Sequence, residues 1–417
     1  MVHVHGAQVQ GRGAGLAPRE RLAVPIDVGK HTAMALVADF TGERFVAPFE
    51  FALDRPGITG LIGRVRATAE ARGIASVEIG VEAAGHYHRP VTASGLFPPD
   101  WLLVELNPAH VTEQRRVLGK RRVKTDQIDL AAMFDLLVAG RGHPTGGHHE
   151  ALADLRAWTA LRHRRVGAVI AVKNQLLGQM DRAFPGAGRC VSTSLVDCKV
   201  GRLVLAHFAD PARLAKLGVD RFRRFAAHRD VIVGRAVAGR FVAAARAVVP
   251  LDGAATAREL LAADLGLLAT LQNQIDGAET VLERLLPDTP FQVLTTTPGW
   301  GLVRAARYGA AVGDPSRWPS ARQVYRASGL TPGQYESAGK RVDGAISREG
   351  SVELRGALLE LGMGLWLCDP ATRPAVARLR ARGKPAGIIA CALANRANRI
   401  AFAMTTNQTA YDPSRWS

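Results

Sequence analysis

The order in which strand-like and helix-like patterns follow one another in residues 22–142 constrains the fold of this chain more than any other feature. Three short apolar runs with the alternation of paired strands come first, and Thr41-Gly42 supplies a turn between the second and the third. Helical stretches and single strands then alternate. The predicted elements are strands over 22–28, 32–40 and 43–53, a helix over 56–71, a strand over 76–81, a short helix over 90–94, a strand over 101–106 and a helix over 126–139.

A meander of three strands followed by alternating crossovers predicts an α/β domain with the topology of the ribonuclease-H-like fold. The Gly- and His-rich stretch 140–150 that follows has the composition of a linker. Its histidines, His143, His148 and His149, lack the helical spacing and the sulfur partners of a metal site, so a solvated loop is the favoured interpretation.

Beyond the linker the patterns are helical. Residues 185–250 are rich in arginine, and residues 254–286 carry the strongest helix pattern of the chain. A short heptad seam in this helix predicts either a coiled coil or an ordinary helix facing the core, since fewer than four clean heptads are present. The seam consists of Leu268, Leu271, Ile275, Ala278, Leu282 and Leu285. We expect a disordered leader over 1–21, an α/β domain over 22–142, a helical coiled-coil middle region over 143–290 and a mostly helical C-terminal domain over 291–417.

The charge of the chain favours a polyanionic partner. Its 54 Lys and Arg residues exceed its 37 Asp and Glu residues by 17, and the 47% of hydrophobic residues excludes a disordered chain. No run of about 18 uncharged apolar residues predicts a membrane-spanning helix, and the first residues lack the apolar segment of a secretory signal. The four cysteines form no CxxC pair, which argues against a zinc cluster and a disulfide framework. We therefore expect reduced cytosolic thiols and no membrane partner.

Acidic residues are scarce, so their positions in the first domain are informative. Asp27 ends the first predicted strand and Glu82 ends the fourth, while Asp126 and Asp129 lie three apart at the start of a helix, where they would share one face. If the two strands are neighbours, their acids converge and the helix can bring the aspartates over them. Carboxylates this close repel one another unless cations lie between them, and oxygen-only ligation selects Mg²⁺ or Mn²⁺. Two such ions would stabilise a phosphodiester displacement.

Each acid also has an ordinary structural explanation. Asp126 and Asp129 could be an N-cap and a first-turn acid that the helix dipole favours, and Asp27 could be a turn residue before Gly29. The metal site is favoured because strand-end acids and a helical Asp-x-x-Asp pair occur together in a chain of charge +17.

Four motifs in this domain carry a family resemblance. They are IDVGKHT, VEAAGHYHRPV, ELNPAHV and KRRVKTDQIDL. In this order they resemble the N-terminal domain of the RuvC-like DEDD transposases of bacterial insertion sequences, the family that includes the Piv DNA invertase and the bridge-RNA-guided recombinases. The resemblance implies that the catalytic, metal-binding acids are Asp27, Glu82, Asp126 and Asp129. It covers about residues 24–403, but over 185–250 only the helical, basic character agrees, and Ala84 stands where many members have threonine.

The C-terminal half resembles the same proteins. The segment around Pro298-Gly299-Trp300-Gly301 resembles their helix-hairpin-helix-like element, whose Gly-rich turn can hold a phosphate, although a Pro-Gly turn between helices is the commoner explanation. In YESAG, Ser337 matches the nucleophilic serine of the family, but by its sequence alone it would be a loop or capping serine. The predicted nucleic-acid contacts are Gly299, Gly301, Arg341, Arg348 and Arg355, and a solvated basic face is the alternative for the three arginines. Core packing is a simpler role than base stacking for Trp300, Trp318 and Trp366.

The resemblance implies a DNA recombinase that excises and inserts a mobile element. Ser337 would attack a DNA phosphodiester to form a phosphoserine, a 3′-hydroxyl would reverse that bond, and Mg²⁺ or Mn²⁺ on the four acids would stabilise the phosphate. Because roughly two hundred residues separate acids and serine, subunits could share the site, with the heptad helix joining a homodimer or tetramer. The implied partners are double-stranded DNA of the element ends and target, and a structured guide RNA held by the Arg-rich middle region, in a cytoplasmic, nucleoid-associated protein.

Two other functions are compatible with the sequence. In a metal-dependent, RuvC-like junction nuclease the four carboxylates would act and Ser337 would be structural, so Ser337→Ala would keep strand cleavage. A non-catalytic nucleic-acid-binding protein with a degenerate acid cluster would instead bind in a salt-sensitive way without metal-dependent chemistry.

Overall fold

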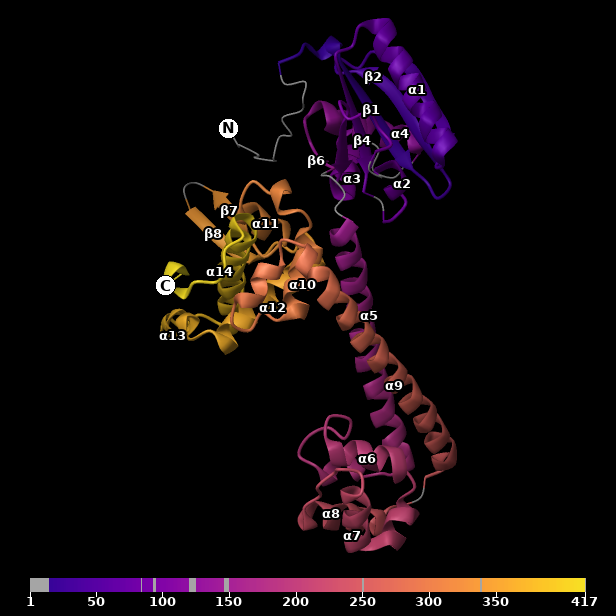
Figure 1. The fold of residues 1–417 in the computed structure, drawn as a ribbon, viewed down its shortest axis with the longest axis vertical. Coiled ribbons are helices and arrows are strands. Elements are labelled where there is room, and N and C mark those ends of the chain that lie inside the picture. Colours follow the sequence, from indigo (N-terminus) through magenta and orange to yellow (C-terminus); the bar gives the residue numbers. More distant parts are fainter. Residues whose placement is uncertain are drawn as a thin grey trace. The chain divides into compact units, whose positions relative to one another are not determined.

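The computed structural model describes most of the 417-residue chain, in the segments 15–83, 85–92, 95–119, 125–145, 150–249, 251–337 and 340–416. The chain divides into two compact units (Figure 1). The N-terminal unit contains Met1–Glu150 together with Asp314–Pro319, and the C-terminal unit contains Ala151–Gly313 together with Ser320–Ser417. Short 3-10 helices lie at Pro18–Glu20, Ala187–Cys190, Leu286–Asp288, Gln292–Thr296, Pro315–Arg317, Pro370–Thr372 and Pro413–Trp416.

The N-terminal unit is built on a six-stranded sheet in the order β3-β2-β1-β4-β5-β6. β1 pairs antiparallel with β2 and parallel with β4, and β4 pairs parallel with β5. The predicted meander and its alternating crossovers are therefore confirmed. The strands are β1 (Arg21–Val28), β2 (Thr32–Asp39), β3 (Arg44–Ala52), β4 (Ser76–Glu82), β5 (Leu102–Leu106) and β6 (His143–Pro144).

Helices cover both faces of this sheet. Leu61 and Val65 of α1 share a core with Ile26 of β1, whereas Met133 of α4 shares another core with Ala23 of the same strand. Since successive residues of a strand point to opposite faces, α1 and α4 pack on opposite sides of β1. The helices of this unit are α1 (Arg55–Arg72), α2 (Arg89–Thr92), α3 (Pro108–Val117) and α4 (Asp126–Val138).

Local sequence explains where α1 begins and ends. The Asp54 carboxylate accepts a hydrogen bond from the Gly57 backbone N–H at 2.8 Å, and Pro56 occupies the first turn. Gly73 ends the helix with a φ of 62°, a conformation that glycine adopts without the clash of a Cβ atom. The helix predicted over 56–71 is thus confirmed.

Three expectations for this region need correction. The prediction of a disordered leader over 1–21 is wrong for its last residues, because residues 18–20 form a 3-10 helix and Arg21 begins β1. Residues 1–14 lie outside the described residues. The linker over 140–150 contains β6, which pairs antiparallel with β5, so the sheet extends past 142. Helix α3 was not predicted, although Asn107 and Pro108 are the N-cap and first-turn residues typical of a helix start.

The C-terminal unit is mostly helical and includes a small hairpin. Its helices are α5 (Glu150–Ala183), α6 (Lys199–His207), α7 (Pro211–Ala227), α8 (Arg235–Ala247), α9 (Ala254–Leu285), α10 (Leu302–Val312), α11 (Ala321–Ala327), α12 (Val352–Cys368), α13 (Arg373–Ala381) and α14 (Ala386–Asn407). The hairpin pairs β7 (Pro332–Ser337) with β8 (Lys340–Ile346). None of the helices in the described segments is long and apolar enough to cross a membrane.

The heptad seam of α9 is partly buried inside this unit. Leu268 and Leu271 lie in the same core as Leu176 of α5. The two long helices are also joined by an ion pair, in which Arg162 Nε donates to Glu279 Oε1 at 2.7 Å. This half of the seam therefore faces the core of its own chain, and a coiled coil between chains stays a prediction.

Tryptophan Trp300 is a core anchor, as the sequence predicted. Its side chain is fully buried, and its indole Nε1–H donates to the Leu361 carbonyl of α12 at 2.8 Å. Trp366 is half-buried, and the Arg380 guanidinium lies 5.1 Å from its ring centroid.

Candidate functional site

The register of two parallel strands places Asp27 and Glu82 at the same end of the sheet. β1 and β4 pair in register up to Ile26 opposite Val81, and the two acids are the next residues of each strand. Because paired residues of parallel strands point to the same face, the acids lie on one side of the sheet. Both are partly exposed. The adjacency of the first and fourth strands, on which the predicted convergence depended, is confirmed.

Helix α4, whose first turn carries Asp129, packs on the same face of the sheet, since its Met133 shares a core with Ala23 of β1. It packs against β4 so closely that a Cβ atom on Gly80 would lie 2.7 Å from the Leu137 side chain. The N-cap of α4 is Thr125, whose hydroxyl accepts from the Ile128 N–H, so the alternative explanation of Asp126 as the N-cap is wrong. Asp126 is exposed in the first turn, whereas Asp129 is 2% exposed. Although three residues apart, the two aspartates thus differ sharply in burial.

The buried Asp129 carboxylate has a cationic neighbour that sequence analysis did not find. Arg115 of α3 places its Nη1 2.9 Å from Asp129 Oδ1 and donates through Nη2 to Thr112 Oγ1. A second contact between the helices, from Gln114 Nε2 to Asp135 Oδ2 at 3.0 Å, holds α3 on α4. Burial of a carboxylate is tolerated only when a charge or hydrogen bonds compensate it. Arg115 supplies that compensation.

The four predicted acids carry the kind of ligand atom that a hard divalent cation prefers. Their donors are all carboxylate oxygens, which Mg²⁺ and Mn²⁺ prefer over zinc-type ligation. Within the described segments, however, no three Asp, Glu, His or Cys side chains form a group that could hold a metal ion. In this arrangement the positive charge beside Asp129 comes from Arg115. A cation would therefore have to compete with that guanidinium.

An edge of the N-terminal unit collects residues that are distant in sequence. Glu105 of β5 lies 3.6 Å from Arg317 and 3.9 Å from His88, measured from carboxylate oxygens to side-chain nitrogens. The rings of His143 and Trp318 have centroids 6.3 Å apart. Partial burial, and then the charge of Arg317, lower the pKa of His143. The prediction of a solvated loop is therefore wrong for His143, which lies in strand β6. His148 and His149 lie outside the described residues.

Ser337 ends strand β7, next to the hairpin turn. Its backbone pairs with Lys340, and Glu336 pairs with Arg341 in the same ladder. Its sequence alone suggested a loop or capping serine, and that interpretation is wrong. The alternation of the hairpin is short and interrupted by a register shift between Pro332 and Gln334, which explains why periodicity did not reveal it.

The glycine-rich turn near 299–301 is packed into the C-terminal unit. Gly299 has a φ of 80°, and a Cβ atom there would lie 2.5 Å from the Gly364 carbonyl oxygen. Arg304 Nη1 donates to the Gly299 carbonyl at 2.6 Å, and Gly301 is the N-cap of α10. These contacts show a structural role for Gly299, and phosphate binding by the turn stays a prediction.

The three arginines predicted to contact nucleic acid lie in different surroundings. Arg355 donates to the backbone carbonyls of Ser328 and Arg348, at 3.0 and 2.9 Å. Arg348 is exposed, and α12 begins only at Val352, so the two arginines do not share a helical face. Arg341 lies in β8.

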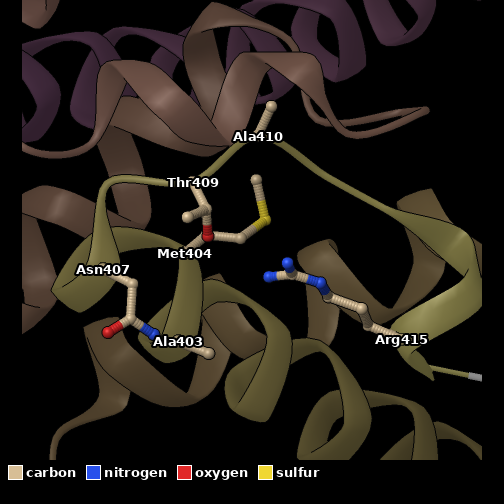
Figure 2. A pocket seen from close by; sticks show the side chains of 6 residues that line it. All are labelled: Ala403, Met404, Asn407, Thr409, Ala410 and Arg415. Carbon is tan, nitrogen blue, oxygen red and sulfur yellow. The ribbon is translucent and has the colours of Figure 1, made fainter.

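Two hollows of the described segments have no predicted catalytic residue in their lining. One, of about 250 Å³, lies at the end of α14, and the Arg415 side chain reaches into it (Figure 2). The other, of about 600 Å³, adjoins the start of α4 and includes Arg44, Thr125 and Gln127 in its lining.

Comparison with known families identifies both halves of the chain. A family of DEDD transposases of IS110 type, described as "Transposase", matches residues 24–185, which contain all four predicted acids. A second family, described as "Transposase IS116/IS110/IS902 family", matches residues 291–376, which contain Ser337 and the predicted basic contacts. Neither match covers residues 186–290.

Individual relatives point the same way. A transposase for insertion sequence element IS1328 from Yersinia enterocolitica is 30% identical over 155 residues, which are 34% of this chain and 43% of the relative. A probable family 20 transposase from Pseudomonas aeruginosa is 30% identical over 186 residues, or 43% of this chain and 54% of the relative. An uncharacterized 44.8 kDa protein of insertion element IS116 from Streptomyces clavuligerus is 25% identical over 75% of this chain and 76% of its own length. The chain spans about half the length of the first two relatives.

Proposed function

The chain belongs to the IS110 type of DEDD transposases, and on that premise we propose that it cuts and rejoins DNA as the transposase of an insertion element. One observation carries the proposal. Asp27 and Glu82 follow paired residues of two parallel strands, and Asp129 lies in the first turn of the helix packed on those strands. Two acids at the same end of neighbouring strands, beside a helix that carries a third, in a chain of charge +17, suit chemistry on a phosphodiester.

The proposed metal ligands are Asp27, Glu82, Asp126 and Asp129. When bound there, Mg²⁺ or Mn²⁺ would stabilise negative charge on the reacting phosphate. The two strand-end acids are partly exposed and therefore accessible to solvent ions, whereas Asp129 would exchange its contact with Arg115 for the cation.

Ser337 is the proposed nucleophile. Its Oγ gives up a proton and forms a bond to phosphorus, while the bond from phosphorus to the 3′-oxygen breaks and that oxygen takes up a proton. A 3′-hydroxyl of the exchanged strand then attacks the phosphoserine, the bond from phosphorus to Oγ breaks, and the serine regains its proton. Each broken phosphodiester is replaced by another ester, so the reaction needs no external energy source.

The proposal extends to partners and location. Double-stranded DNA is the substrate class that fits the charge of the chain. A structured guide RNA, a homodimer or tetramer, and a place in the cytoplasm near the nucleoid rest on the family resemblance alone.

Recombination between two plasmids that carry the DNA flanking this gene tests the proposal. We expect Ser337→Ala and Asp129→Asn each to lower recombination at least about a thousandfold. Stopping the reaction with detergent should leave wild-type protein covalently attached to DNA, and Ser337→Ala should leave none. Ser347→Ala, which changes an exposed serine just after the same hairpin, is the matched control and should retain both activities.

The outcomes separate the possible functions. Normal recombination by Ser337→Ala would exclude this serine as the nucleophile. Strand cleavage without rejoining, unaffected by Ser337→Ala but lost in Asp129→Asn, would indicate a metal-dependent nuclease. Salt-sensitive DNA binding without any metal-dependent cleavage in the wild type would indicate a non-catalytic binding protein.

A further inference from the structure

Much of the excess charge of the chain lies in a segment that neither family match covers. Residues 186–250 contain 12 Arg and Lys residues but only 4 Asp and Glu residues, which is a net charge of +8 out of +17. This segment folds as α6, α7 and α8 around a core of its own with the ends of α5 and α9. A folded, strongly basic module outside the matched regions needs its own explanation.

Helix α7 concentrates this charge on one face. Leu214, Phe222 and Ala226 point into the core, and Gly218, with a φ of 72°, kinks the helix between them. The opposite side is exposed and basic, and we call it the α7 basic face. It consists of Arg213, Lys216, Arg221 and Arg224 of α7 and of Arg229 in the turn that follows the helix.

Three of the four acids of the module have partners that are not members of this face. Asp197 pairs with Lys173 at 2.8 Å, and Asp220 pairs with Arg235 at 3.3 Å. Asp210 caps the start of α7 by accepting from the Ala212 N–H. Among the residues that the structure describes, no ion pair involves a member of the α7 basic face. Its charge is therefore not neutralised by ion pairing within this part of the chain.

Two members of the face are held close together. The Arg229 guanidinium carbon lies 3.8 Å from the Phe225 ring centroid, and that of Arg213 lies 5.9 Å from the Phe208 centroid. Both charges lower the pKa of His207, after the larger effect of burial. Like charges gathered around one point repel one another, and a bound anion would relieve that repulsion.

The turn that follows α7 adds an apolar element. Ile232 lies between α7 and α8 and is 97% exposed. It follows Arg229 closely in the chain and precedes the first residue of α8, Arg235. Proteins that bind the minor groove of DNA frequently insert an apolar side chain between base steps, beside their cationic contacts.

We propose that the α7 basic face binds the sugar-phosphate backbone of double-stranded DNA, with Ile232 as an apolar contact at its end. The identity of the polyanion as DNA rests on the proposed function. Gly218 divides α7 into two arms, and the ring centroids of Phe208 and Phe225, which Arg213 and Arg229 contact, lie 5.0 Å apart, so the cations form a compact cluster that can meet several phosphates of one duplex. Binding of this kind reads no sequence, so it would add affinity for any DNA near the reacting site.

The test measures DNA binding by the full chain without catalysis. Fluorescence anisotropy of a labelled 30-base-pair duplex of arbitrary sequence, with EDTA present, would give the affinity at several KCl concentrations. For Arg221→Gln with Arg224→Gln, we expect the salt slope to fall by about 2, or about 0.9 for each phosphate that is no longer neutralised. When KCl is raised from 50 to 200 mM, the affinity of this double variant should therefore fall about twelvefold less than the affinity of the wild type. Ile232→Ala should weaken binding without changing the slope.

A double variant elsewhere controls for the reduced net charge. Arg66→Gln with Arg284→Gln removes two exposed arginines from α1 and α9, and its salt slope should equal that of the wild type. Equal slopes for both double variants would overturn the proposal. So would a slope change seen only with an RNA duplex of the same sequence, which would assign the face to RNA. Because EDTA binding assays require no strand cleavage, failure here is distinct from failure of the recombination test.

Discussion

Arg115→Ala would leave the Asp129 carboxylate buried without the guanidinium that faces it. Asp129 is 2% exposed, Arg115 is 16% exposed, and 2.9 Å separate their nearest side-chain atoms. Removing one partner of a buried pair costs about 3–5 kcal/mol, because the remaining charge keeps its desolvation cost. Since Arg115 reaches solvent in part, water can replace some of its effect. We therefore expect the lower end of this range, about 3 kcal/mol.

Hydrogen exchange of peptides from β1 and α4 would measure this loss where it occurs. A destabilisation of about 3 kcal/mol corresponds to roughly a hundredfold faster exchange of the protected amides. Millimolar Mn²⁺ should slow exchange more in Arg115→Ala than in the wild type, because the cation would then bind beside Asp129 without competition from the guanidinium. The double variant Arg115→Ala with Asp129→Asn should lose less stability than the two single variants combined.

Arg116→Ala is the matched control, since it removes an exposed arginine next to Arg115 in the same helix. Its effect should stay within about 0.5 kcal/mol. If Arg115→Ala were no more destabilising than Arg116→Ala, the compensating role of Arg115 would be refuted. If Mn²⁺ slowed hydrogen exchange equally in the wild type and in Arg115→Ala, the proposed competition between the cation and Arg115 at Asp129 would also be refuted.

Two further predictions concern the C-terminal unit. Burial, and then the charges of Arg229 and Arg213, lower the pKa of His207, so the unfolded chain binds a proton at this histidine more readily than the folded chain. The stability that His207 contributes is therefore present above a pH of about 6.5 and decreases as the pH falls. In urea unfolding followed from about pH 7.5 to about pH 5.5, His207→Gln should flatten that decrease. An unchanged pH dependence would contradict this. Gly299→Ala should lower the midpoint of thermal unfolding, with a cost of at least about 1–3 kcal/mol, because its φ is 80° and its Cβ would meet the Gly364 carbonyl. Gly60→Ala, in the exposed part of α1 with open space around it, should leave the midpoint unchanged or raise it, and equal losses in both variants would argue against the strain.

Elements set by neighbouring residues could be predicted from the sequence. The alternation of the first three strands and the spacing of the apolar residues in α1 are local patterns, and they identified the meander and its first crossover helix. The same patterns placed Asp27 and Glu82 at strand ends, whereas their convergence depended on the adjacency of the two strands, which the structure shows. Such predictions succeed because side chains a few residues apart decide which face of an element is apolar.

Contacts between residues distant in the sequence were decided only by the tertiary structure. Arg317 meets Glu105 because the segment 314–319 folds onto the N-terminal unit, and no local pattern predicts that return. The hairpin that carries Ser337 is stabilised by its partner strand rather than by its own periodicity. Asp126 and Asp129 are alike in the sequence, yet only the packing of α3 on α4 buries Asp129 and sets Arg115 beside it. Local sequence determines which elements form, but burial and charge pairing depend on which elements meet in space.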